Sequence, residues 1–187
     1  MYHLTMNIYL IRHGEAAANW QDATDPGLSK LGRNQAELAA AELAPRLAPA
    51  TRIISSPMQR AKETADPLCE LAGRDYDIVD DFREIPSPVP VAQRREWLGN
   101  MISQRWDQQH GMVLDWRRTI LGQLDGLHEP TVIFTHFMVL NVIVGAVTSS
   151  DKIVSFRPDN ASVTELRREG SGLRLLQLGR ELETVVN

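Results

Sequence analysis

Four side chains suited to phosphoryl chemistry follow short apolar segments of the sequence: Arg12, His13, Arg60 and His136. Arginine offers a planar fork of donors that matches phosphate oxygens, and histidine can act as nucleophile, acid or donor near neutral pH. Neighbouring guanidinium charges disfavour protonation of a histidine, so that one ring nitrogen keeps its lone pair for attack. These residue types, if they meet in one pocket, predict a site for phosphoryl transfer.

The expected reaction has two steps. Attack by an imidazole would give a phosphohistidine intermediate, which water would then hydrolyse, while the arginines stabilise the charge of the phosphoryl group. The leaving alkoxide needs a proton, and Glu84 in the acidic, proline-containing segment 80–90 is the candidate acid. The alternative is that Asp80, Asp81 and Glu84 form a solvated acidic loop.

Short β-forming runs alternate with longer helical segments, which predicts an α/β fold with a mostly parallel sheet and an antiparallel edge. The last two runs flank a glycine-containing turn and predict a hairpin. In such sheets ligands bind beyond the carboxyl ends of the parallel strands, where Arg12, His13 and His136 stand. The expected strands are residues 6–11, 52–55, 77–79, 131–135, 161–168 and 173–178.

Helix-start signals occupy the segments between these strands. Ser29 is the expected N-cap of a helix whose apolar side carries Leu31, Leu38, Leu43 and Leu47. Ser56 followed by proline is the expected start of a second helix, which has Arg60 in its first turn. An arginine there opposes the helix dipole, but it suits a pocket that holds an anion.

Further helical segments complete the expected fold. Pro67 is expected to kink or break the second helix, which should end near Gly73. Residues 91–127 read as helical, and residues 138–147 read as a buried helix.

Composition limits the classes of protein. The 187 residues fit one domain, and 43% hydrophobic and 24% charged residues are ordinary for a globular protein. A net charge of −4 argues against a nucleic-acid-binding surface. The single cysteine forms no internal disulfide, and no segment resembles a signal peptide or a membrane span. A cytoplasmic protein with no membrane or nucleic-acid partner is expected.

Five ordered motifs resemble the histidine phosphatase superfamily, the phosphoglycerate mutase-like proteins, from about residue 7 to residue 163. Each motif alone is weak, whereas the ordered set is specific. They are Arg12-His13-Gly14-Glu15, the stretch from Asp25-Pro26-Gly27-Leu28-Ser29 to Gln35-Ala36, Ser55-Ser56-Pro57 with Arg60-Ala61 and Thr64-Ala65, Phe82-Arg83-Glu84, and Thr135-His136.

The resemblance implies a three-layer αβα sandwich and a role for each matching residue. His13 would be the phosphorylated nucleophile, and Glu84 would be the proton donor. Glu15 would support the pocket without taking part in the chemistry. The phosphate pocket would comprise Arg12, Asn19, Arg60 and His136. No metal or organic cofactor is implied.

Departures from the family pattern bear on the substrate. Ala16 stands where the family commonly has Ser or Thr, and Phe137 and Met138 follow the second histidine where glycine is common. The substrate side of the pocket should therefore be narrower or apolar. The acid loop lacks the basic and tyrosine residues of the glycolytic mutases, which favours a phosphatase acting on a small phosphorylated substrate.

Residues 1–187 are expected to form a single domain with a helical, substrate-covering insertion at about 86–128, which is also where a homodimer interface is expected. Its tryptophans Trp97, Trp106 and Trp116 are expected on the apolar side of helices, or alternatively around an apolar leaving group. The alternatives to a phosphatase are a phosphoglycerate-type mutase and a non-catalytic module that binds a phospho-ligand. The remaining histidines are expected at the surface: His3, His110 and His128.

Overall fold

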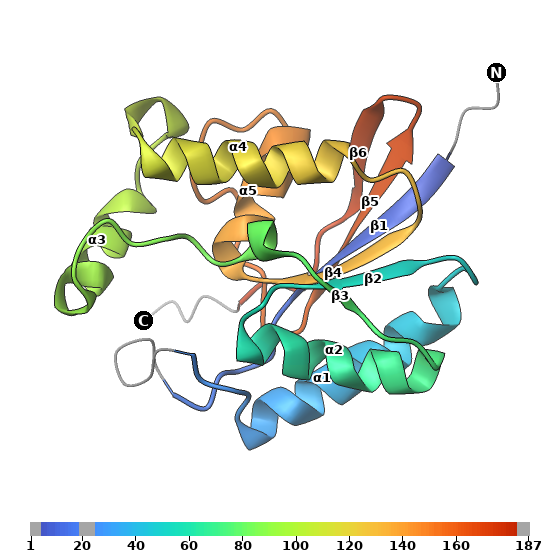
Figure 1. Cartoon of the computed structure of the whole chain (residues 1–187). Helices are drawn as coiled ribbons and strands as arrows, with labels where there is room; N and C mark the ends of the chain where they lie inside the picture. The colour runs from blue at the N-terminus through green and yellow to red at the C-terminus, as the bar shows by residue number, and fades with distance from the viewer. Residues whose placement is uncertain (1–4, 19–24, 183–187) are drawn as a thin grey trace.

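The computed structural model describes residues 5–18 and 25–182. Its centre is a six-stranded sheet of order β3-β2-β4-β1-β5-β6, in which β1 to β4 are parallel and β5 and β6 form an antiparallel edge (Figure 1). The mostly parallel sheet and the closing hairpin are as predicted. The strands are β1 (Thr5–Arg12), β2 (Arg52–Ser55), β3 (Asp77–Ile78), β4 (Thr131–Thr135), β5 (Val163–Glu169) and β6 (Gly172–Gln177).

Helices cover both faces of this sheet, which makes the three-layer αβα sandwich. In Figure 1, α1 and α2 lie on one face, α4 and α5 lie on the other, and α3 lies beyond one end of the sheet. Their bounds are α1 (Lys30–Leu43), α2 (Gln59–Ala72), α3 (Arg94–Met101), α4 (Met112–Asp125) and α5 (Phe137–Val147). Short 3₁₀ turns occupy Ala44–Arg46, Asp80–Phe82, Val91–Gln93 and Trp106–Gln108.

Alternate residues of the central strands supply two hydrophobic cores. On β1, Ile8 and Leu10 belong to the core under α4 and α5, whereas Tyr9 and Ile11 belong to the core under α1 and α2. All five residues of β4 are buried, as befits a strand between two others in a sheet covered on both faces.

Helix α1 begins where Ser29 predicts, because the Ser29 hydroxyl accepts a hydrogen bond from the Gly32 N–H at 2.9 Å. The predicted apolar side is wrong in part: Leu31 and Leu38 are 52% and 72% exposed, whereas Leu43 is buried as predicted. Small residues face inward instead, and they let α1 pack closely against α2 and the sheet: Gly32, Ala36, Ala39 and Ala40.

Helix α2 begins later than predicted. Its N-cap is Met58 rather than Ser56, because the Ser56 hydroxyl is engaged with His136. Pro67 does not break it: the helix runs on to the predicted end at Gly73, whose φ of 63° suits glycine. Burial of Leu68 beside the proline favours the continuous helix over the break expected from local propensity.

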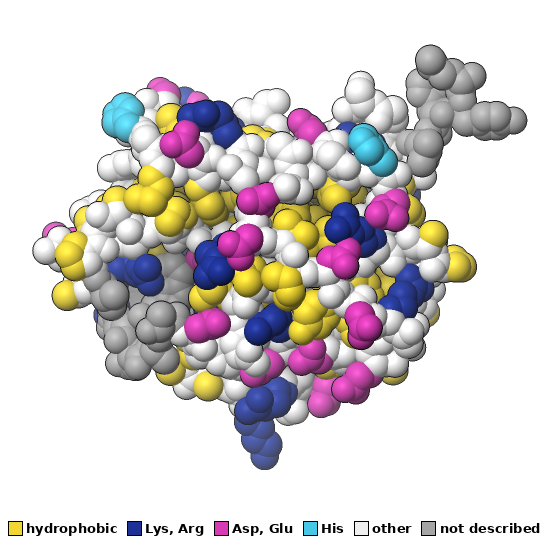
Figure 2. All heavy atoms as spheres, in the orientation of Figure 1, with side chains coloured by type: hydrophobic (Ala, Val, Ile, Leu, Met, Phe, Trp, Pro, Cys, Tyr) yellow, Lys and Arg dark blue, Asp and Glu magenta, His cyan; other side chains and the backbone are white. Residues whose placement is uncertain are grey.

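The segment predicted as helical from 91 to 127 contains two helices, α3 and α4, separated by a turn at which Gly111 has φ of 53°. Basic, acidic and hydrophobic side chains intermingle on the face shown in Figure 2. Among the described residues, no helix is both long and apolar enough to cross a membrane.

Candidate active site

The parallel pairing of β1 with β4 brings the two histidines together. Arg12 lies opposite Thr135 in the register, so His13 and His136 follow neighbouring strand ends. The His13 backbone N–H donates to the Thr135 carbonyl at 2.9 Å, and the two imidazole centroids are 5.3 Å apart. The sheet thus produces the juxtaposition that the strand-end pattern predicts.

Hydrogen bonding fixes the tautomer of His13. Its Nδ1 lies 2.7 Å from the Gly14 carbonyl oxygen, which can only accept, so Nδ1 carries the proton and donates. Burial, together with the charges of Arg60 and Arg12, lowers the pKa of His13 to about 3. His13 is therefore neutral at physiological pH, with an unprotonated Nε2 available as a nucleophile.

The backbone after His13 is held by close contacts to both neighbouring helices. The Gly14 N–H donates to the Thr64 hydroxyl at 3.0 Å, and that hydroxyl donates to the Arg60 carbonyl at 2.6 Å. A Cβ on Gly14 would lie 2.5 Å from the Gly32 carbonyl oxygen, which explains why a glycine occupies this position.

Glu15 is bound to the start of α1. Its carboxylate accepts from the Ser29 hydroxyl at 2.6 Å, and its backbone N–H donates to the Gln35 side chain at 2.9 Å. These contacts agree with a supporting role, because the carboxylate fixes the loop that carries His13.

Two arginines supply the positive charge of the site. Arg12 donates from Nη1 to the Pro158 carbonyl at 2.8 Å, and its guanidinium lies 5.4 Å from the centroid of the Phe137 ring. Arg60 is 1% exposed and has Nη1 3.8 Å from an Asp25 carboxylate oxygen. Burial lowers the pKa of both guanidinium groups, and the charge of Glu84 opposes that shift. Two partly desolvated cations favour binding of a dianionic group.

Glu84 is buried in the same site, unlike its acidic neighbours. Its carboxylate accepts from the backbone N–H groups of Ile85 at 3.0 Å and of Met138 at 3.4 Å, and it is 9% exposed. Burial raises its pKa, against the opposing effects of these hydrogen bonds and of Arg60 and Arg12. A carboxyl group with a raised pKa can hold a proton for a leaving group.

The alternative of a solvated acidic loop applies to part of this segment. Asp80 pairs with Arg83 near the surface, and the Asp81 carboxylate accepts from the Gln123 side chain at 2.6 Å. Glu84 points the other way, into the site, because the Thr135 hydroxyl anchors the preceding Phe82 carbonyl at 2.8 Å.

His136 lies behind His13 and is completely buried. Its Nε2 lies 2.7 Å from the Ser56 hydroxyl, and its Nδ1 has no hydrogen-bond partner within the described ranges. Burial is the main cause that lowers its pKa well below the usual histidine range, and the positive charges of Arg60 and Arg12 act in the same direction. His136 is not among the described residues that line the cavity, but its ring lies next to that of His13, with 5.3 Å between the centroids. Sequence reasoning missed Ser56 as its partner, although Ser56 also follows a parallel strand.

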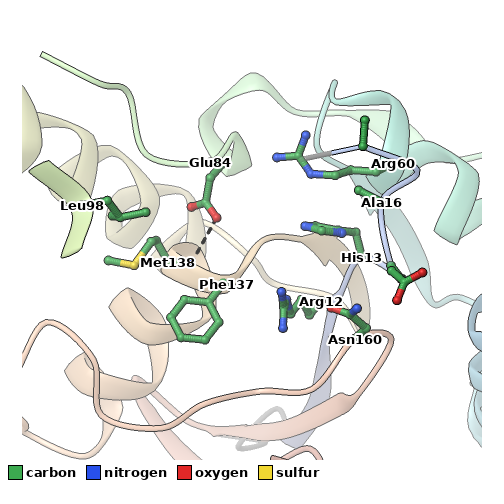
Figure 3. A pocket seen from close by; sticks show the side chains of 11 residues that line it. Arg12, His13, Ala16, Arg60, Glu84, Leu98, Phe137, Met138 and Asn160 are labelled. Atoms are coloured by element: carbon green, nitrogen blue, oxygen red, sulfur yellow. Dashed lines mark hydrogen bonds between the residues drawn. The ribbon is translucent and has the colours of Figure 1, made fainter. Parts of the chain in front are cut away.

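A cavity of about 350 Å³ opens over these groups (Figure 3). Its described lining comprises Arg12, His13, Glu15, Ala16, Ala18, Arg60, Glu84, Leu98, Phe137, Met138 and Asn160. Asn19 lies outside the described residues, as does His3. Trp97, Trp106 and Trp116 do not line the cavity: they pack on the hydrophobic core, as the first of the two interpretations expects. His110 and His128 are exposed, as predicted.

Sequence reasoning also missed Asn160, which precedes β5. Figure 3 shows its side chain beside Arg12, and its Oδ1 is buried without a hydrogen-bond partner in the described part of the chain. The next residue, Ala161, has φ of 53°, and its N–H donates to the carbonyls of Arg12 and His13 at 3.0 and 3.3 Å. A left-handed alanine is strained, and these hydrogen bonds hold the turn that places Asn160 at the cavity. Because a left-handed backbone at a residue other than glycine has no signature in the sequence, this turn could not be predicted.

The described residues also bear on whether the chain could hold a metal ion. Within residues 5–18 and 25–182, no three His, Cys, Asp or Glu side chains gather as a metal-binding cluster.

Comparison with known proteins gives two related sequences. "Putative phosphoserine phosphatase 2" of Hydrogenobacter thermophilus is 24% identical over 95% of this chain and 97% of its own length. "Probable phosphoglycerate mutase GpmB" of Salmonella typhi is 32% identical, but the match covers 65% of this chain and 53% of that protein.

Solved structures share the fold. The phosphoserine phosphatase of Entamoeba histolytica, in complex with 3-phosphoglyceric acid, has a TM-score of 0.72 at 18% identity, over 94% of this chain and 97% of that one. A mycobacterial glucosyl-3-phosphoglycerate phosphatase has a TM-score of 0.68 at 22% identity, over 95% and 100%. These likenesses support the three-layer architecture.

The family itself is established by sequence. Residues 8–181 match the histidine phosphatase superfamily (branch 1), a span that includes the Arg12-His13 motif, Arg60, Glu84 and His136. The chain belongs to the histidine phosphatase superfamily.

Proposed function

We propose that this protein hydrolyses phosphomonoesters through a covalent phosphohistidine on Nε2 of His13. The observation that carries the proposal is the hydrogen bond from His13 Nδ1 to the Gly14 carbonyl, which leaves Nε2 as the free lone pair beside the half-buried Arg12 and the buried Arg60. The related sequence named as a phosphoserine phosphatase supports hydrolysis as the outcome.

In the first step, the Nε2 lone pair attacks phosphorus and an N–P bond forms while the bond from phosphorus to the ester oxygen breaks. Protonated Glu84 gives its proton to the departing oxygen, and Arg12 and Arg60 stabilise the charge on the transferred group. In the second step, water attacks phosphorus and loses a proton to the Glu84 carboxylate. The N–P bond then breaks, phosphate leaves, and the electron pair returns to Nε2.

The two arginines supply the charge stabilisation that a metal ion provides in other phosphatases, so we propose that the reaction is independent of metal. We also propose that His136 and Asn19 complete the phosphate site, and that residues 86–128 form a substrate-covering insertion. Leu98 of α3, which lines the cavity, supports the last proposal.

The test is hydrolysis of p-nitrophenyl phosphate by the wild type and by His13→Ala, with EDTA present, together with labelling by a ³²P-labelled substrate that is quenched in alkaline detergent. We expect activity that survives EDTA, an acid-labile and base-stable label on the wild type, and neither in the variant. Activity that EDTA abolishes, or that both proteins share, would contradict the mechanism.

Product analysis separates the other two interpretations. A mutase would yield an isomeric phosphoester in place of free phosphate, whereas a binding module would bind phosphate esters without turnover. Because one related sequence is named as a probable phosphoglycerate mutase, the mutase is the alternative to test first.

A further inference from the structure

The cavity has two chemically different ends, which Figure 3 shows in one view. Arg12, His13 and Arg60 lie on one side, and Leu98 and Met138 lie on the other. Glu84 lies between the two groups, where a proton donor must meet the ester oxygen of a phosphate bound at the cationic end. The remainder of a bound ester would therefore extend toward the second end.

That second end is an apolar wall, formed by Leu98 of α3 and by Phe137 and Met138 of α5. Met138 is 1% exposed, and all three residues belong to or pack on the main hydrophobic core. The Met138 backbone N–H donates to Glu84, so that this part of the wall is held at a fixed place relative to the proton donor.

Two polar groups of the described lining adjoin the apolar wall, and both belong to the phosphoryl end: Glu84 accepts from the Met138 N–H, and the Arg12 guanidinium lies 5.4 Å from the centroid of the Phe137 ring. Asn160 lies beside Arg12, at the phosphoryl end (Figure 3). The Glu15 carboxylate accepts a hydrogen bond from Ser29 in the loop after His13. A carboxylate or ammonium group seated on Leu98, Phe137 and Met138 would lose its water without gaining a partner from those side chains, which is costly.

We propose that the organic group of the substrate is small, uncharged and apolar next to the ester oxygen, and that it packs on Leu98, Phe137 and Met138. The inference rests on the phosphatase function proposed above and names its substrate class: phosphomonoesters of simple alcohols without a charged substituent. The cavity volume of about 350 Å³ suits a small ligand.

The test compares n-butyl phosphate with O-phosphoserine, since both leave as alkoxides and differ mainly in charged substituents. We expect kcat/KM for n-butyl phosphate to exceed that for O-phosphoserine by about tenfold or more. Leu98→Arg should reduce this ratio by about tenfold, because it places a cation on the wall. Leu38→Arg, the same change on the exposed face of α1, should leave the ratio unaltered.

Arg94 provides the competing explanation. It begins α3, and its positive charge acts on Arg60, so it could pair with a substrate carboxylate. A preference for O-phosphoserine that Arg94→Ala removes would overturn the apolar assignment. Phe137→Ala is a second wall variant. If the assignment holds, it should lower kcat/KM for n-butyl phosphate more than kcat/KM for O-phosphoserine.

Binding separates this inference from the catalytic proposal. Calorimetry with n-butylphosphonate and 3-phosphonopropionate, which contain no ester bond, should show tighter binding of n-butylphosphonate. If the protein binds n-butylphosphonate more tightly but hydrolyses no phosphomonoester, the phosphatase function is contradicted and the apolar subsite is supported. Equal binding, or tighter binding of 3-phosphonopropionate, would overturn the subsite even in an active phosphatase.

Discussion

Hydrogen bonds to the two histidines decide which ring nitrogens are available for chemistry. The bond from His13 Nδ1 to the Gly14 carbonyl leaves Nε2 free, and Ser56 occupies Nε2 of His136. Ser56 is completely buried and also accepts from the Met58 N–H at 3.3 Å, so its hydroxyl has a defined position. We therefore expect Ser56 to act through His136 as a positioning residue.

Ser56→Ala should lower kcat by about tenfold, the effect of losing one buried hydrogen bond, with little change in KM. Ser56→Thr retains the hydroxyl and should restore much of the activity. Steady-state kinetics on p-nitrophenyl phosphate and thermal unfolding of both variants provide the measurement. An equal loss in the two variants, or a loss explained by unfolding, would contradict the positioning role.

Glu84→Gln should reduce kcat for an alkyl phosphate by about 10²–10⁴-fold, because an amide has no proton for the alkoxide. The loss on p-nitrophenyl phosphate should be smaller, since nitrophenolate leaves without a proton. Burial raises the pKa of Glu84, so wild-type activity should persist above the usual range of a carboxyl group and fall as pH rises through that pKa.

The pH profile of Glu84→Gln supplies the check on that assignment. Its residual activity should lack the alkaline decline attributed to Glu84. A profile with the same alkaline limb in the variant and the wild type would assign the limb to another group.

At the scale of elements, the site depends on how tightly the loop after β1 packs on α1 and α2. Gly14 and Gly32 face each other, and a Cβ on Gly32 would lie 2.1 Å from the Glu15 carbonyl oxygen. Backbone atoms on both sides leave little room to relax. This close contact holds the loop that carries His13 against α1, and the hydrogen bond from the Gly14 N–H to Thr64 holds it against α2, the helix of Arg60.

Gly14→Ala should destabilise the fold by about 1–3 kcal/mol through overpacking and reduce phosphatase activity, because the loop that carries His13 must shift. Gly122→Ala is the matched control, since no atom lies within 4 Å of the added Cβ on α4. The control should gain about 0.5–1 kcal/mol from helix propensity and keep its activity. Urea unfolding of the two variants distinguishes these outcomes.

At the scale of the whole molecule, charges intermingle on the face shown in Figure 2, whereas Arg12 and Arg60 concentrate positive charge in the cavity. The same burial holds His13 neutral and makes stability depend on pH. In the unfolded chain, His13 gains a proton as the pH falls below about 6.5, the ordinary pKa of histidine. In the folded chain it stays unprotonated until about pH 3. Stability therefore falls as pH falls through that window.

Between about pH 7 and about pH 5, the free energy of unfolding of His13→Gln should fall by about 2 kcal/mol less than that of the wild type. The reason is that the unfolded variant has no histidine at position 13 to protonate. The raised pKa of Glu84 acts in the opposite direction in both proteins, so it cancels in the comparison. Exposed His128→Gln is the control and should follow the wild type. Equal pH dependence for His13→Gln and the wild type in denaturant titrations would contradict the shifted pKa.

Local sequence determined much of the fold. The strand at 52–55 matches its predicted bounds, the Ser29 cap and the Gly73 end are as predicted, and the strand-end pattern predicts the meeting of His13 with His136. Hydrophobic runs, capping residues and left-handed turns are local signals, so they can be read without knowledge of distant contacts. The ordered motifs likewise identified the family.

Tertiary contacts decided the rest. The inward side of α1 comprises small residues and Leu43 rather than Leu31 and Leu38, and the N-cap of α2 is Met58 rather than Ser56, which hydrogen-bonds His136. Asn160 reaches the cavity beside a left-handed alanine, and Leu98 lines it from α3, far along the chain from His13. Burial, pKa shifts and cavity walls arise when residues distant in the chain exclude water together, and no local pattern specifies which residues will do so.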